Sequence, residues 1–107
     1  MKLLTKAIRD TLPALGSQDG KGLNATALVK FFTPDSSWSW WASEGEPIMQ
    51  DGAEVDFQFF GYVRGLEGEL GYFNLSQLES VKGPMGLPIE RDQWFTAMPL
   101  LNAIAAP

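Results

Sequence analysis

The ten residues from Val55 to Arg64 constrain the fold more than any other part of the chain. Bulky side chains alternate along this run, with Phe57 and Phe59 on one side and Phe60 and Tyr62 on the other, which is typical of a β-strand. A strand with large apolar residues on both faces needs cover on both faces. One face therefore belongs to the core. The other must meet helices, long loops, a ligand or a second chain, and we favour cover by the terminal segments.

Three further runs complete a predicted antiparallel sheet of about four strands. Residues 26–33 and 37–43 both alternate, and the Pro-containing turn between them predicts a hairpin. Residues 69–74 form the last strand, after a turn that contains glycine. Because the strands follow one another without intervening helices, the sheet should be antiparallel. The polar segment 44–54 contains glycine and proline, and we expect it to be a loop.

Short helices are expected at both termini and after the fourth strand. Apolar residues at every fourth position predict a helix over residues 3–12. A second helix is predicted over 75–81, and a third over 100–105 with a proline at its first position. The glycines and prolines of 83–88 exclude regular structure there, and 90–96 should be extended or helical. The predicted fold class is therefore α+β.

The size and composition of the chain predict one domain over residues 1–107. Hydrophobic residues make up 45% of the chain and charged residues 20%, which are ordinary values for a globular protein. We find no repeat, no low-complexity tract and no linker that would divide the chain.

The chain contains neither histidine nor cysteine. This excludes Ser-His-Asp and Cys-His catalysis within one chain, together with disulfides, zinc–thiolate sites and iron–sulfur clusters. We assign no catalytic residue, no metal site and no cofactor. The first ten residues are too charged for a secretory signal, and no apolar run approaches the roughly 20 residues of a membrane span. We expect a cytoplasmic protein without membrane contact.

Charge is distributed unevenly along the chain. Residues 1–30 carry five basic and two acidic side chains, a net charge of +3, whereas residues 31–107 carry a net charge of −8. The segment from Asp35 to Glu69 contains eight acidic residues and a single basic residue, Arg64. Such a field repels phosphate backbones, so we expect no direct contact with nucleic acid. The acids either form a solvated surface or meet a basic partner. The candidate binding surface combines these acids with aromatic and arginine anchors: Asp35, Trp41, Glu44, Glu46, Asp51, Glu54, Tyr62, Arg64, Glu67 and Glu69.

Four segments of the chain resemble a bacterial family, the domain of unknown function 2958. The segments are Val29–Pro34 with Trp38 and Trp40, Phe59–Phe73, Leu78–Pro84 and Gly86–Asp92. The resemblance covers nearly the whole chain. Members are similar in occurring on plasmids, phages and integrative elements, near accessory and anti-restriction genes. The resemblance therefore implies a role in mobile-element biology, and it implies no particular reaction.

Two carboxylate clusters could carry chemistry. Glu67 and Glu69 stand two positions apart beside a turn, where they could bind a divalent cation or act as an acid–base pair, although a solvated hairpin end is the more common cause of such spacing. Glu90, Arg91 and Asp92 could belong to a metal-dependent nuclease. We favour a structural ion pair in which Arg91 binds a carboxylate and fixes the preceding Gly/Pro loop.

These observations leave three functional hypotheses. The first is a non-enzymatic accessory protein of mobile elements that binds a protein partner, such as a nucleic-acid-binding defence complex, and acts as an acidic counter-defence inhibitor of the anti-CRISPR or anti-restriction type. The alternative is a metal-dependent hydrolase or nuclease built on carboxylates. The third is an assembly subunit that dimerises through its aromatic sheet face. Across the three hypotheses we expect the protein to be a monomer or a homodimer. We favour the first.

Overall fold

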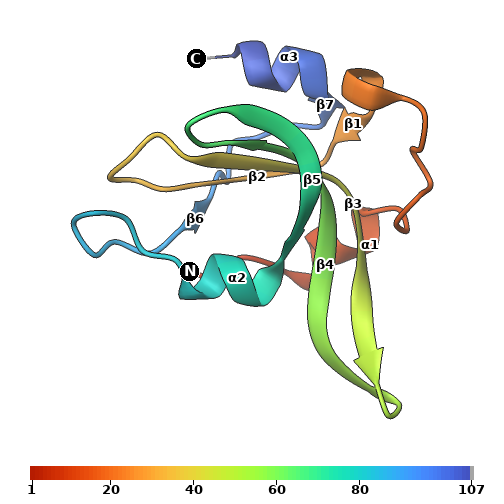
Figure 1. The fold of residues 1–107 in the computed structure, drawn as a ribbon. Coiled ribbons are helices and arrows are strands. Elements are labelled where there is room, and N and C mark those ends of the chain that lie inside the picture. Colours follow the sequence, from red (N-terminus) through yellow and green to blue (C-terminus); the bar gives the residue numbers. More distant parts are fainter. Residues whose placement is uncertain (107) are drawn as a thin grey trace.

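The computed structural model describes residues 1–106. A five-stranded antiparallel sheet with the order β5-β4-β3-β2-β6 lies between two layers of short elements (Figure 1). Along the chain the elements are α1 (Lys6–Thr11), the 3₁₀ helix η1 (Gly22–Asn24), β1 (Thr26–Ala27), β2 (Val29–Phe32), β3 (Ser39–Gln50), β4 (Ala53–Arg64), β5 (Gly68–Asn74), α2 (Leu75–Ser80), β6 (Glu90–Arg91), β7 (Met98–Pro99) and α3 (Leu100–Ala105). The predicted α+β class is confirmed, with one strand more in the sheet than expected.

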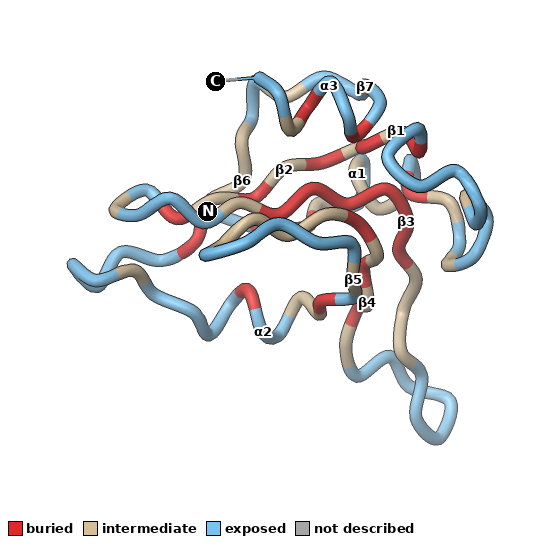
Figure 2. The backbone as a smooth tube through the Cα atoms, turned by 45° about the horizontal axis from the view of Figure 1, so that its top comes forward, coloured by how far each residue is buried: buried red, intermediate tan, exposed pale blue. Residues whose placement is uncertain are grey.

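The β3–β4 hairpin corrects one sequence prediction. The segment 44–54, expected to be a loop, instead continues both strands to a two-residue turn at Asp51 and Gly52, both with positive φ. Pro47 is tolerated in β3 because β2 begins at Val29, opposite Ala42, so the pairing of β2 with β3 does not reach Pro47. Gly45 is required because a Cβ there would lie 2.6 Å from the Phe57 ring. The end of this hairpin projects from the body and is exposed (Figures 1 and 2).

One face of the sheet packs against α1 and α2. Phe31, Phe57 and Phe59 are buried there, and Leu78 of α2 joins them. The aromatic rings contact one another at tilted angles, with centroids 5.1 Å apart for Phe57 and Phe59 and 5.5 Å apart for Phe31 and Phe59. This layer is the main core.

The opposite face is covered by the C-terminal segment, as we favoured from the sequence. Trp41 lies in a second buried cluster with Ala27 of β1 and with Leu100 and Ala103 of α3. The small β1–β7 sheet fixes this cover, since Thr26 pairs with Pro99 and Ala27 with Met98. Figure 2 shows the resulting band of buried residues along β3, between the two layers.

The remaining predictions hold in part. The first helix is shorter than residues 3–12 because Thr5 accepts a hydrogen bond from the Ile8 N–H and starts the helix at Lys6. The run 26–33 divides into β1 and β2, which belong to different sheets. Of the segment 90–96, only Glu90 and Arg91 form a strand. No helix in the described part of the chain is long and apolar enough to cross a membrane.

Candidate functional site

Two acids of the predicted binding surface instead bind the loop that follows α1. Glu44 is only 2% exposed, and its carboxylate accepts hydrogen bonds from the N–H groups of Gly16 (2.8 Å) and Gln18 (2.7 Å). Glu46 accepts one from the Leu15 N–H at 2.9 Å. The irregular segment after α1 is thereby fixed to β3. The prediction that Glu44 forms part of an external surface is wrong, because its side chain is buried and its carboxylate binds backbone donors of this chain.

Asp35 is also engaged within the chain. Its Oδ2 accepts hydrogen bonds from the N–H groups of Met85 (2.8 Å) and Leu87 (3.4 Å), and so holds the Gly/Pro loop. Its Oδ1 lies against Gly83, where a Cβ would come within 1.5 Å. The loop that we expected Arg91 to fix is therefore fixed by Asp35.

Two further acids contact neighbouring elements. Glu54 forms an ion pair with Arg9 of α1, and this hydrogen bond lowers the pKa of Glu54. Asp56 accepts hydrogen bonds from the hydroxyl and the N–H of Ser76 in the first turn of α2. These bonds, led by the one from the Ser76 side chain, lower the pKa of Asp56.

The three predicted aromatic and arginine anchors support α3 instead of projecting outward. Trp41 is 1% exposed, so its prediction as a surface anchor is wrong. Its ring lies under the guanidinium of Arg64, 5.0 Å away, and beside the half-buried Tyr62 ring, 6.0 Å away. Arg64 also donates a hydrogen bond to the Ile104 carbonyl at the end of α3 (3.0 Å). The sequence around Trp41 predicts an exposed side chain, but packing against α3, which is distant in sequence, buries it.

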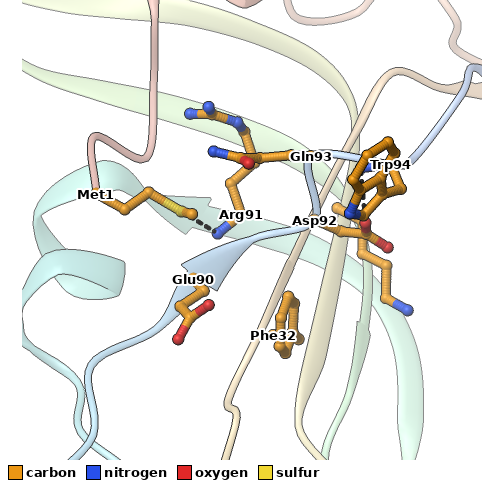
Figure 3. A pocket seen from close by; sticks show the side chains of 8 residues that line it. Met1, Phe32, Glu90, Arg91, Asp92, Gln93 and Trp94 are labelled. Carbon is orange, nitrogen blue, oxygen red and sulfur yellow. Dashed lines mark hydrogen bonds between the residues drawn. The ribbon is translucent and has the colours of Figure 1, made fainter.

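The predicted ion pair of Arg91 with Glu90 or Asp92 is replaced by contacts to the N-terminus. Figure 3 shows the guanidinium of Arg91 directed away from both carboxylates. It donates hydrogen bonds to the carbonyls of Lys2 and Leu3, the latter at 3.1 Å. Neighbouring side chains on one strand alternate between faces, which separates Arg91 from its two acidic neighbours. Arg91 therefore holds the first residues of the chain along β6.

A hollow of about 390 Å³ lies beside this strand. Lys30, Glu90, Asp92 and Trp94 line it, and Trp94 is 91% exposed (Figure 3). The lining mixes charges of both signs on an open surface, with Lys30 and Arg91 beside Glu90 and Asp92. Nowhere in residues 1–106 do three Asp or Glu side chains gather in a way that could hold a metal ion.

The acids left without a partner in residues 1–106 include Glu67 and Glu69, on either side of the start of β5. Beside them, Leu70 is 39% and Tyr72 64% exposed on the second face of the sheet. Tyr72 contacts the Phe60 ring edge to face, with centroids 4.9 Å apart. We call Phe60, Glu67, Glu69, Leu70 and Tyr72 the β5 surface. It includes the open edge of the sheet, because Glu69 lies on the opposite face of β5 from Leu70 and Tyr72. The binding surface predicted from the sequence included the two glutamates but not Phe60, Leu70 or Tyr72, although the alternation of residues 69–74 places Leu70 and Tyr72 on one face.

A second hollow, of about 350 Å³, adjoins the β5 surface. Its lining includes the apolar side chains of Phe60 and Leu70 together with Asp19 and Gly20 of the loop before η1. An apolar wall with an exposed carboxylate at the rim matches a Lys or Arg side chain, whose stem is apolar and whose head is charged.

The comparisons with known proteins agree with the resemblance seen in the sequence. Residues 3–106 match the family described as Protein of unknown function (DUF2958), so the chain belongs to this family. No curated protein and no solved structure gave a significant match.

Proposed function

We propose that the protein is a non-enzymatic binding protein whose β5 surface recognises a basic segment of a protein partner. The proposal includes the setting implied by the family resemblance, an accessory role in mobile genetic elements such as inhibition of a nucleic-acid-binding defence complex. In that setting the partner's basic groove would contact the β5 surface.

The observation that carries the proposal is the combination of exposed apolar side chains with carboxylates free of internal contacts. Leu70 and Tyr72 stand out from an antiparallel sheet beside Glu67 and Glu69, and in the described chain neither glutamate makes an ion pair. Exposed apolar clusters bordered by charge are typical of protein interaction sites. Tyrosine is also enriched among the residues that contribute most to binding.

Internal contacts narrow the acidic surface to a small area. Five of the eight acids between Asp35 and Glu69 bind backbone or side-chain groups of this chain, and they are Asp35, Glu44, Glu46, Glu54 and Asp56. The remaining three are Asp51, at the tip of the β3–β4 hairpin, and the two glutamates of the β5 surface. Asp51 and Glu67 lie at opposite ends of β4, so they belong to different surfaces. A basic partner would therefore contact the β5 surface and not the whole acidic stretch.

A capture experiment with matched variants tests the proposal. Tagged protein is incubated with host lysate at low and high salt, and the bound proteins are identified. We expect a specific partner whose recovery falls at high salt and with the double variant Glu67→Gln/Glu69→Gln. Asp51→Asn removes an exposed charge elsewhere and should leave recovery unchanged. The proposal fails if no specific partner is recovered, or if the double variant and Asp51→Asn behave alike.

A further inference from the structure

The two edges of the sheet differ in how they are protected. β6 is a two-residue strand, and Arg91 holds Lys2 and Leu3 beside it. β5 has seven residues and forms the other edge, where the order of the sheet places no strand beyond it. Its pairing with β4 runs from Arg64↔Gly68 to Gln58↔Asn74 without a bulge. A long, regular edge of this kind is a template for another strand.

The side chain that caps α2 identifies which backbone groups of β5 face outward. The Asn74 N–H donates to the Gln77 side chain at 2.8 Å, so it points away from β4. Along an antiparallel strand, the N–H and C=O groups of every second residue point to the same side. Leu70 and Tyr72 therefore direct their backbone N–H and C=O groups to the open edge, while Gly71 and Phe73 direct theirs to β4.

We infer that the partner's basic segment is extended and binds by adding a sixth strand to the sheet along Leu70–Tyr72. This inference rests on the proposed function and names the form of the partner. Leu70 and Tyr72 lie on one face of β5 and Glu69 lies on the other. An added strand would place alternate side chains against the two apolar residues and the rest beside Glu69. The partner segment thus alternates apolar and basic residues, which complements both the edge and its charge.

The test uses a defined peptide and a pair of variants at one position. The probe is a synthetic peptide of about ten residues that alternates lysine and valine, labelled for fluorescence anisotropy. A peptide that alternates glutamate and valine serves as its control. Leu70→Ala removes a side chain, whereas Leu70→Pro also removes the outward N–H and blocks the edge without affecting a bond to β4. We expect Leu70→Pro to bind the lysine–valine peptide at least about tenfold more weakly than Leu70→Ala, and the glutamate–valine peptide not to bind.

Amide hydrogen exchange provides a second measurement that does not depend on the folding of a variant. In the free wild-type protein the N–H groups of Leu70 and Tyr72 should exchange fast, and those of Gly71 and Phe73 slowly. The lysine–valine peptide should protect Leu70 and Tyr72. If Leu70→Pro does not fold, protection of these two N–H groups in the wild-type protein tests strand addition without the variant.

The possible results separate this inference from the proposed function. Wild-type protein that does not bind the lysine–valine peptide overturns strand addition, and the lysate experiment then decides independently whether a basic partner exists. Binding without protection of Leu70 and Tyr72, or with equal affinity in both variants, also overturns strand addition and leaves recognition by side chains. Protection that increases with protein concentration in the absence of peptide would assign the edge to a second copy of the chain, and would equally contradict the inference.

Discussion

The carboxylate of Glu44 accepts a hydrogen bond from the backbone N–H of Gln18 at 2.7 Å, within a site from which solvent is almost excluded. The same carboxylate binds the N–H of Gly16. One side chain of β3 thus satisfies two backbone donors of the irregular segment that follows α1. Hydrogen bonds to a charged acceptor are stronger than those between neutral groups, so the Glu44 carboxylate contributes substantially to holding this segment against β3.

Replacement of Glu44 by glutamine should destabilise the protein. The amide offers one carbonyl oxygen in place of two carboxylate oxygens, so one of the two backbone N–H groups would face an NH₂ group. We expect Glu44→Gln to lower the free energy of unfolding by about 2 kcal/mol in urea denaturation. Glu69→Gln makes the same chemical change at an exposed position and should alter it by less than about 0.5 kcal/mol. Equal effects of the two variants would contradict the structural role of Glu44.

Asp56 should make the stability of the protein depend on pH in the acidic range. Its hydrogen bonds with Ser76 lower the pKa in the folded state from the ordinary 3.8. Stabilisation from a carboxylate with a lowered pKa is fully present above the unfolded pKa, and it is lost as the pH falls through the folded pKa. We therefore expect Asp56→Asn to flatten the curve of melting temperature against pH below about pH 5. Asp51→Asn is the control, and a curve for Asp56→Asn parallel to that of wild type would refute this prediction.

Two glycines of neighbouring strands should respond in opposite ways to alanine. A Cβ at Gly61 would lie 1.8 Å from the backbone oxygen of Trp41, which cannot move without separating β3 from β4. Gly61→Ala should therefore lower the free energy of unfolding by about 3 kcal/mol or prevent folding. At Gly71, a Cβ would meet no atom within 4 Å. Gly71→Ala should change stability by less than about 1 kcal/mol. Comparable losses of melting temperature in both variants would show that strand propensity, and not close approach, explains Gly61.

Divalent cations should leave the thermal stability of the protein unchanged. Glu67 and Glu69 are exposed, and in the described residues no third carboxylate joins them to form a metal site. A ligand that binds only the folded state raises the melting temperature. We expect the same melting curve with Mg²⁺, Mn²⁺ or a chelator. A rise with metal that Glu67→Gln abolishes would support the alternative of a carboxylate-based hydrolase.

The alternation of side chains along the chain was sufficient to predict β4 and β5. The prediction of a loop over residues 44–54 failed because contacts with distant residues decide the structure there. The alternation from Val55 to Arg64 predicted a strand because it is strong and continuous. The outer half of β3 showed no such alternation, since much of it lies beyond the body and is under no constraint to bury alternate residues. Gly45 and Pro47 appeared to be loop residues. Gly45 lies in the strand because the Phe57 ring packs against it, and Pro47 is tolerated because β2 pairs with β3 only as far as Ala42. Neither partner lies within a short window of sequence around these residues.

The candidate site shows the same division between local and distant information. The sequence determined which residues carry charge, that histidine and cysteine chemistry is unavailable, and that both faces of the strand Val55–Arg64 need cover. Only the tertiary structure decided that Trp41 and Glu44 face inward and that Leu70 and Tyr72 face solvent. The physical reason is that burial and hydrogen bonding are set by partners far along the chain, such as α3 for Trp41 and Gln18 for Glu44. The alternation of a strand specifies two faces, but the segments that pack on the strand determine which positions on each face remain open.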